Sequence, residues 1–172
     1  MSTPQAPATL EEFLAQALAM ELEAAQRYDE LADAMEVHHN REVGELFRKM
    51  SSIEGKHASQ IMAQMGWSAV PANARAPAWA GFEGAETISH EDLHYRMQPW
   101  HALQLALAAE RRAADFFGHL VGVVPDGAVR AAAQELQLEE REHVELIQAW
   151  IAKVPPPDPD WDEDPDPPRY DE

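Results

Sequence analysis

Four segments of the chain carry apolar residues at helical spacing, and ionisable side chains interrupt the apolar stripe of each segment. Burying a carboxylate without a compensating charge costs several kcal/mol, so such a pattern is unfavourable unless cations lie among the carboxylates. A bundle that buries all the stripes would gather these side chains in its core, where two divalent ions would balance the glutamates. The interrupting residues are Glu21, Glu54, His57, Glu110, Glu140 and His143.

The first two segments are predicted to form an antiparallel helical hairpin. Thr9-Leu10-Glu11-Glu12 has the form of a capping box and predicts a helix over residues 10–37. Asn40 is a suitable N-cap for a second helix, and Gly66 is a typical stop signal for it. The short link between the two helices favours antiparallel packing.

The last two segments are predicted to form a second hairpin after a long connection. Residues 67–98 contain prolines and glycines without sustained periodicity, and a connection of this length can cross the height of a bundle. Pro99 suits the first turn of a third helix, Pro125-Asp126-Gly127 turns the chain, and Pro155 begins a proline run that ends a fourth helix. The expected fold class is all-α, a four-helix bundle of two hairpins joined by a crossover.

The composition supports an all-α fold and excludes several functions. Alanine dominates the apolar residues and β-branched residues are sparse, which favours helices over sheet. Because the chain has no cysteine, it has no disulfide, no cysteine-ligated metal site and no thiol nucleophile. The net charge of −18 argues against a nucleic acid or an anionic membrane surface as a partner. No leader segment or long apolar run is found, so a cytoplasmic protein is expected.

The chain is predicted to contain one folded domain between two flanking segments. Residues 1–9 form a lead-in and residues 10–154 form the bundle. Residues 155–172 form a proline-rich tail with eight acidic residues and one arginine. Such a segment buries too little apolar surface to fold alone, so we expect a disordered acidic tail, solvated or draped on the surface. A role in partner docking or metal capture is the alternative.

The two halves of the chain repeat the same pattern of residues. Glu21 is followed by alanine at +3 and by Tyr28 at +7, and Glu110 is followed by alanine at +3 and by Phe117 at +7. Each half then supplies a Glu-x-x-His, whose spacing places both side chains on one helical face. One such carboxylate can bridge two metals while its histidine binds one of them. An oxygen-rich set of six ligands favours iron or manganese over zinc.

One simpler interpretation of these residues competes with metal binding. The six side chains could form a buried network of salt bridges and hydrogen bonds, although the stripes hold few lysines or arginines as partners. Glu-x-x-His also occurs where Glu36 precedes His39 and Glu91 precedes His94, at a helix end and in the connection. Neither pair has a matching carboxylate, so we expect the remaining histidines to be surface or packing residues: His38, His39, His90, His94, His101 and His119.

The sequence resembles the rubrerythrin-like (erythrin-type) family of the ferritin-like diiron-carboxylate superfamily. The resemblance covers roughly residues 10–153 and is most specific at Glu21, Ala24 and Tyr28 and in the run 138–143. It implies a ferritin-like four-helix bundle with two iron ions. The implied terminal ligands are Glu21 and Glu110, the implied bridges are Glu54 and Glu140, and His57 and His143 would bind one iron each.

The chain departs from the family in three respects. Rubrerythrin proper has a cysteine-ligated rubredoxin domain, and this chain has no cysteine. Peroxidase members carry a further glutamate on the third helix, at the position of Ala113. Phe117 lacks the hydroxyl that Tyr28 provides in the first half. The resemblance therefore supports the fold and the metal site more strongly than a peroxidase activity.

The function expected from this resemblance is a diiron oxidoreductase that oxidises an Fe(II) pair with hydrogen peroxide or dioxygen. Tyr28 would hydrogen-bond a ligand carboxylate or a bound oxygen species, or would serve only as a core aromatic residue. The alternatives are a ferroxidase or iron-handling protein, for storage or transport, and a purely structural bundle. A homodimer and an external, rubredoxin-like electron donor are the family-based expectations for partners.

Overall fold

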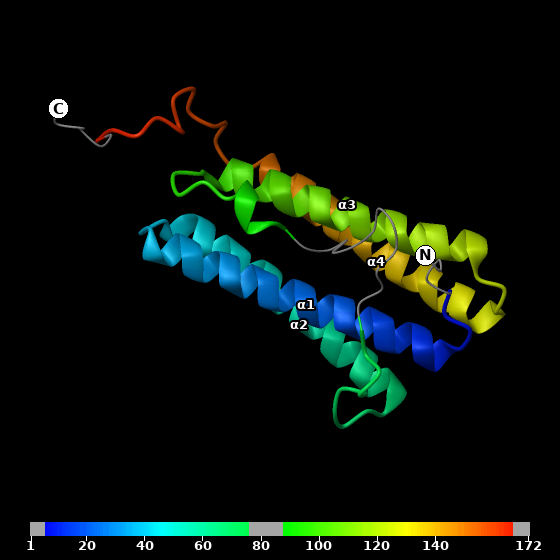
Figure 1. The fold of residues 1–172 in the computed structure, drawn as a ribbon. Helices are drawn as coiled ribbons and strands as arrows, with labels where there is room; N and C mark the ends of the chain where they lie inside the picture. Colours follow the sequence, from blue (N-terminus) through cyan, green and yellow to red (C-terminus); the bar gives the residue numbers. More distant parts are fainter. Residues whose placement is uncertain (1–5, 76–87, 167–172) are drawn as a thin grey trace, which may run out of the picture.

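The computed structural model describes residues 6–75 and 88–166, and this part of the chain contains four long helices and no strand. The helices are α1 (Leu10–Val37), α2 (Arg41–Met65), α3 (Pro99–Val123) and α4 (Gly127–Ile151), with a short 3-10 helix η1 (His90–Asp92) before α3. Figure 1 shows α1 paired with α2, and α3 paired with α4, as two hairpins lying side by side. The predicted all-α, ferritin-like bundle is confirmed.

The helix ends follow the local signals in the sequence. Thr9, Asn40 and Asp126 each accept a hydrogen bond from the backbone N–H three residues later, at 3.1, 3.4 and 2.9 Å. These caps satisfy backbone donors that the first turn of a helix leaves unpaired. Gly66 ends α2 with φ at 68°, a left-handed conformation that glycine adopts without a steric penalty.

The apolar core of the bundle consists of two clusters, one toward each end. Cluster 1 packs the start of α1 against the end of α3, and includes Phe13, Leu18, Phe117 and Leu136. Cluster 2 packs the end of α1 against the start of α2 and α3, and includes Tyr28, Phe47, Leu103 and Ile147. Along every helix, the ionisable residues identified in the sequence lie between residues of cluster 1 and residues of cluster 2.

The described part of the crossover is anchored on the first hairpin. Ile88 and Met97 are buried in cluster 2, and their backbone carbonyls accept hydrogen bonds from side chains of the first hairpin. Arg27 donates to the carbonyl of Ile88 at 3.4 Å, and Asn40 donates to that of Met97 at 2.6 Å. The chain therefore enters α3 from a fixed position beside the α1–α2 turn. Residues 76–87 of the predicted connection lie outside the described residues.

The tail has no helix or strand between residues 155 and 166, and part of it contacts the bundle. Gln98 and Asp158 exchange two hydrogen bonds, at 2.6 and 2.9 Å. The Trp161 ring lies 3.9 Å from the His101 ring between centroids, and it packs against cluster 2. This short stretch is therefore held against the start of α3, while residues 167–172 of the predicted tail lie outside the described residues.

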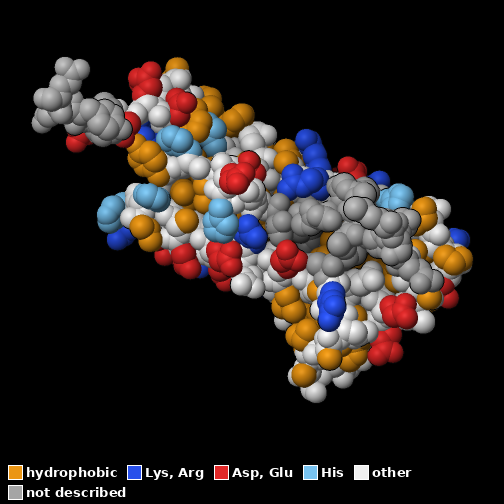
Figure 2. All heavy atoms as spheres, viewed as in Figure 1, with side chains coloured by type: hydrophobic (Ala, Val, Ile, Leu, Met, Phe, Trp, Pro, Cys, Tyr) orange, Lys and Arg blue, Asp and Glu red, His pale blue; other side chains and the backbone are white. Residues whose placement is uncertain are grey.

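The surface of the bundle is polar over much of the face seen in Figure 2. Acidic side chains are spread over it, and histidines gather near the end where the tail leaves. Within the described ranges, none of the helices combines the length and apolar character that a bilayer span requires.

Candidate metal centre

The middle turns of the four helices carry the predicted ligand residues into the gap between the two core clusters. The glutamates are almost fully buried: none has more than 2% of its surface exposed. His143 is also buried, and the His57 side chain is 12% exposed. Carboxylates are rarely buried this deeply without compensating charges, so this polar layer is the unusual feature of the core.

The histidine of each hairpin lies beside the first glutamate of the same hairpin. His143 Nδ1 is 3.3 Å from Glu110 Oε2 and 3.6 Å from Glu140 Oε2. His57 Nδ1 is 3.6 Å from Glu21 Oε1. The structure thus places two half-sites side by side, one on α1 and α2 and the other on α3 and α4.

Two of the glutamates contact both half-sites. The possible ligand atoms form three overlapping groups, each spanning no more than 4.8 Å: Glu54 with His57 and His143, Glu21 with His57 and Glu140, and Glu110 with Glu140 and His143. Glu54 therefore lies near both histidines, and Glu140 lies near both terminal glutamates. These are the positions that bridging carboxylates would need.

The environment of the two carboxylates shared by the half-sites, Glu54 and Glu140, suits a bound cation. The oxygens of Glu54 and Glu140 are buried and have no hydrogen-bond partner in the described residues. Within the described ranges no lysine or arginine forms an ion pair with them, and their nearest charged neighbours are histidines and other glutamates. Buried carboxylates without such partners destabilise a fold unless they are protonated or bind metal. Divalent cations would supply the missing charge.

Burial shifts the pKa values of three glutamates of the site, and the net direction differs among them. Burial, and secondarily the charge of Glu110, raises the pKa of Glu54 to about 8. Burial also raises the pKa of Glu140 well above its ordinary value. Burial acts in the same direction on Glu110, but the interaction with His143, whose Nδ1 lies 3.3 Å from Glu110 Oε2, acts against it, and the pKa of Glu110 is lowered.

His57 is in the protonation state that metal binding requires. Burial, and next the neighbouring His143, lowers the pKa of His57 to about 4, so its imidazole is neutral at physiological pH. A neutral imidazole has a free lone pair for a metal ion. The His57 Nδ1 atom is buried and has no hydrogen-bond partner within the described residues.

The other predicted residues do not belong to the groups of possible metal ligands. Tyr28 is buried in cluster 2 with its ring 6.1 Å from that of Phe47, an environment typical of a core aromatic residue. Its catalytic role stays a prediction. In the described parts of the chain, none of the remaining histidines belongs to a group of possible metal ligands, and none is buried.

Sequence reasoning missed Glu139, which lies at the edge of the site. Its Oε2 atom is 4.0 Å from His57 Nδ1, and its side chain is 40% exposed. Burial raises its pKa. The only signal in the sequence was its position next to Glu140 and four residues before His143. The spacing of four residues places it on the same side of α4 as His143.

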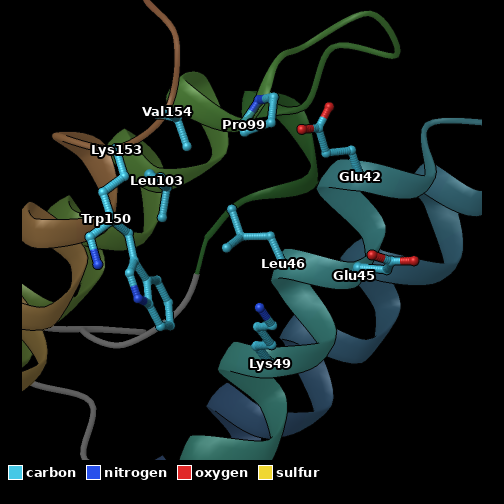
Figure 3. A pocket seen from close by; sticks show the side chains of 9 residues that line it. All are labelled: Glu42, Glu45, Leu46, Lys49, Pro99, Leu103, Trp150, Lys153 and Val154. Atoms are coloured by element: carbon cyan, nitrogen blue, oxygen red, sulfur yellow. The ribbon is translucent and has the colours of Figure 1, made fainter.

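A pocket near one end of the bundle is separate from the metal centre. It has a volume of about 260 Å³ and lies between the start of α2, the start of α3 and the end of α4. Figure 3 shows Leu46 and Trp150 directed into this space, with Lys49 at one side. None of the predicted metal ligands lines it.

Fold and site together define a ferritin-like four-helix bundle with a buried centre of carboxylates and histidines. The rubrerythrin family matches residues 12–151, and the chain belongs to that family. The chain is also similar to a crystal structure of an uncharacterized conserved protein from Magnetospirillum magnetotacticum MS-1. The two are 34% identical with a TM-score of 0.62, and the match covers 87% of this chain and 98% of the other. No curated protein matches the chain.

Proposed function

We propose that the chain binds two iron ions and oxidises Fe(II) with hydrogen peroxide or dioxygen. The observation that carries this proposal is the pair of half-sites joined by two buried carboxylates, Glu54 and Glu140. Paired half-sites favour two neighbouring ions over one, because each half supplies its own histidine and its own terminal glutamate. Manganese or zinc could occupy the same ligands, but a set rich in carboxylates favours iron.

The residues of the site would perform distinct tasks. Glu21 and His57 would hold one ion, Glu110 and His143 would hold the other, and Glu54 and Glu140 would bridge them. When bound, a ferrous pair supplies two electrons, which with two protons reduce one peroxide to two waters. Clusters 1 and 2 would keep bulk water out of the centre, and Tyr28 would hydrogen-bond a ligand carboxylate or the oxidant.

Repeated turnover would require electrons from outside the chain. The sequence has no cysteine and hence no built-in rubredoxin-type relay. A separate electron donor, a homodimeric assembly and a cytoplasmic location are the remaining parts of this proposal. The donor and the dimer rest on the family and not on any contact seen in the structure.

A single-turnover experiment tests the proposed reaction. Protein loaded with Fe(II) without oxygen is mixed with peroxide or dioxygen, and ferric absorption is followed before and after adding reductant, with and without a rubredoxin-type carrier. We expect fast oxidation, followed by re-reduction that accelerates only when the carrier is present. Oxidised iron that leaves the protein, or accumulates beyond two ions per chain, would instead assign a ferroxidase or iron-handling function. No oxidation of bound iron would leave a structural bundle.

A further inference from the structure

We propose that metal ions reach the centre through the pocket between α2 and α4, and that the Glu139 carboxylate receives them there. This inference rests on the proposed metal-binding function and adds a path and a positioning residue to it. It concerns how the ligands of the buried centre are supplied with ions, which the ligand set alone does not explain.

The pocket is a narrow groove formed by one face of α2 and one face of α4. Its volume is about 40 Å³, which is enough to hold water or a small hydrated ion's ligands. The four lining positions on each helix have the spacing i, i+3, i+4 and i+7. The groove therefore follows about two helical turns, roughly 10 Å. The lining residues are His57, Gln60, Ile61 and Gln64 from α2 and Ala132, Glu135, Leu136 and Glu139 from α4, with Leu14 from α1.

His57, a proposed ligand of the centre, lies at the inner end of the groove. His57 lines the groove and also belongs to two of the three groups of possible ligand atoms. The glutamates of the centre are at most 2% exposed, so an ion cannot meet them directly from bulk water. The His57 side chain keeps 12% of its surface exposed, and its buried Nδ1 lies 3.6 Å from Glu21. An ion in the groove would therefore reach the centre past His57.

Carboxylates along α4 become more buried toward the centre. Glu135 is exposed, the Glu139 side chain is 40% exposed, and Glu140 is fully buried. Glu135 and Glu139 are four residues apart and lie on the same helical face, toward the groove. A hydrated divalent cation prefers oxygen ligands and loses its water in steps. This series provides an oxygen ligand at each step, ending at the bridging position.

Glu139 is the member of this series that can contact both water and the centre. Its carboxylate is 4.0 Å from His57 Nδ1, and within the described ranges no lysine or arginine forms an ion pair with it. Its charge is therefore available to an incoming cation. A negative charge on the path to a buried site raises the local concentration of cations and their rate of binding.

The test compares Glu139→Gln with Glu145→Gln, which removes the same charge from an exposed position of α4 outside the groove. Metal-free protein is mixed with Co²⁺, and uptake is followed by the visible absorption of the bound ion. Final metal content is measured separately. We expect Glu139→Gln to slow uptake on the order of tenfold, with less dependence on salt, while the final metal content stays unchanged. Glu145→Gln should take up Co²⁺ at the wild-type rate.

Two results would overturn the access route. Equal uptake rates in the two variants would show that ions do not pass Glu139. Loss of an ion from Glu139→Gln at equilibrium would make Glu139 a resident ligand and not an access group. Failure of the wild-type chain to bind Co²⁺ at all would instead contradict the proposed metal centre, so the two hypotheses fail separately.

Discussion

The imidazole rings of His57 and His143 stack with their centroids 4.5 Å apart and their planes inclined by 20°. One ring comes from each hairpin, so this contact joins the two halves of the internal repeat across the bundle. Two imidazolium ions at this distance would repel each other, and the neighbouring charge of His143 contributes to the lowered pKa of His57. The stacked pair therefore disfavours charge on both rings at once, and each ring has its own terminal glutamate beside it.

Loss of a shared carboxylate should remove more metal than loss of a terminal one. Glu54→Ala or Glu140→Ala removes a side chain that contacts both half-sites, so we expect both ions to be lost on dialysis. Glu21→Ala should keep close to one ion, because the ligands around His143 are intact. Metal analysis after dialysis measures this difference. The reverse order of metal loss would show that the bridging and terminal roles are exchanged.

Metal loading should release protons at neutral pH. The pKa of Glu54 is about 8, so this carboxyl holds a proton in the metal-free protein at pH 7, and burial shifts the pKa of Glu140 in the same direction. Binding a divalent ion requires the carboxylate forms, and we expect one to two protons to be released per chain. A pH indicator in weakly buffered solution measures the release. Glu54→Gln should reduce it, and an unchanged signal would contradict the protonated state.

Metal-free protein should lose stability as the pH rises from about 5 to 8. The pKa of Glu54 is raised in the folded state, so its contribution to stability is complete below the unfolded value of 4.5. That contribution is lost as the pH rises through about 8, because the unfolded chain gives up the proton more readily. Glu54→Gln removes this titration. The melting temperature of the wild type should therefore fall with pH relative to that of the variant, and parallel curves would contradict the raised pKa.

The contact between Trp161 and the start of α3 should stabilise the bundle modestly. Trp161→Ala removes a partly buried ring that packs on His101 and cluster 2, which we expect to cost about 1 kcal/mol. The melting temperature should then fall by about 2–4 °C. Truncation after Asp166 keeps Trp161 and serves as the control, with no change expected. Equal melting temperatures for Trp161→Ala and the wild type would show that the contact does not persist in solution.

Much of the fold follows from local capping and termination signals in the sequence. Thr9, Asn40 and Gly66 mark helix ends through their own hydrogen bonds or backbone conformation, so the predicted boundaries of α1 and α2 are matched. The cluster of possible ligands was also predictable, because a glutamate on an apolar stripe is costly and the two halves repeat the same spacing. The structure brings all six residues together.

The features that the sequence did not predict depend on contacts between distant segments. Glu139 lies beside the ligand stripe, and its approach to His57 depends on the separation of α2 and α4. Trp161 lies in a segment too polar to fold alone, and only the surface formed by His94 and His101 gives its ring a place to pack. Periodicity and capping describe one helix at a time, so they carry no information on these contacts.

Anaerobic titration of the metal-free protein with Fe(II) tests the central claim most directly. Bound iron is determined by metal analysis at each addition, and the ferric absorption is recorded after oxidation. Two half-sites that share Glu54 and Glu140 predict saturation at two ions per chain, with both ions lost together in Glu54→Ala. Saturation at one ion, or no binding by a correctly folded chain, would contradict a diiron centre.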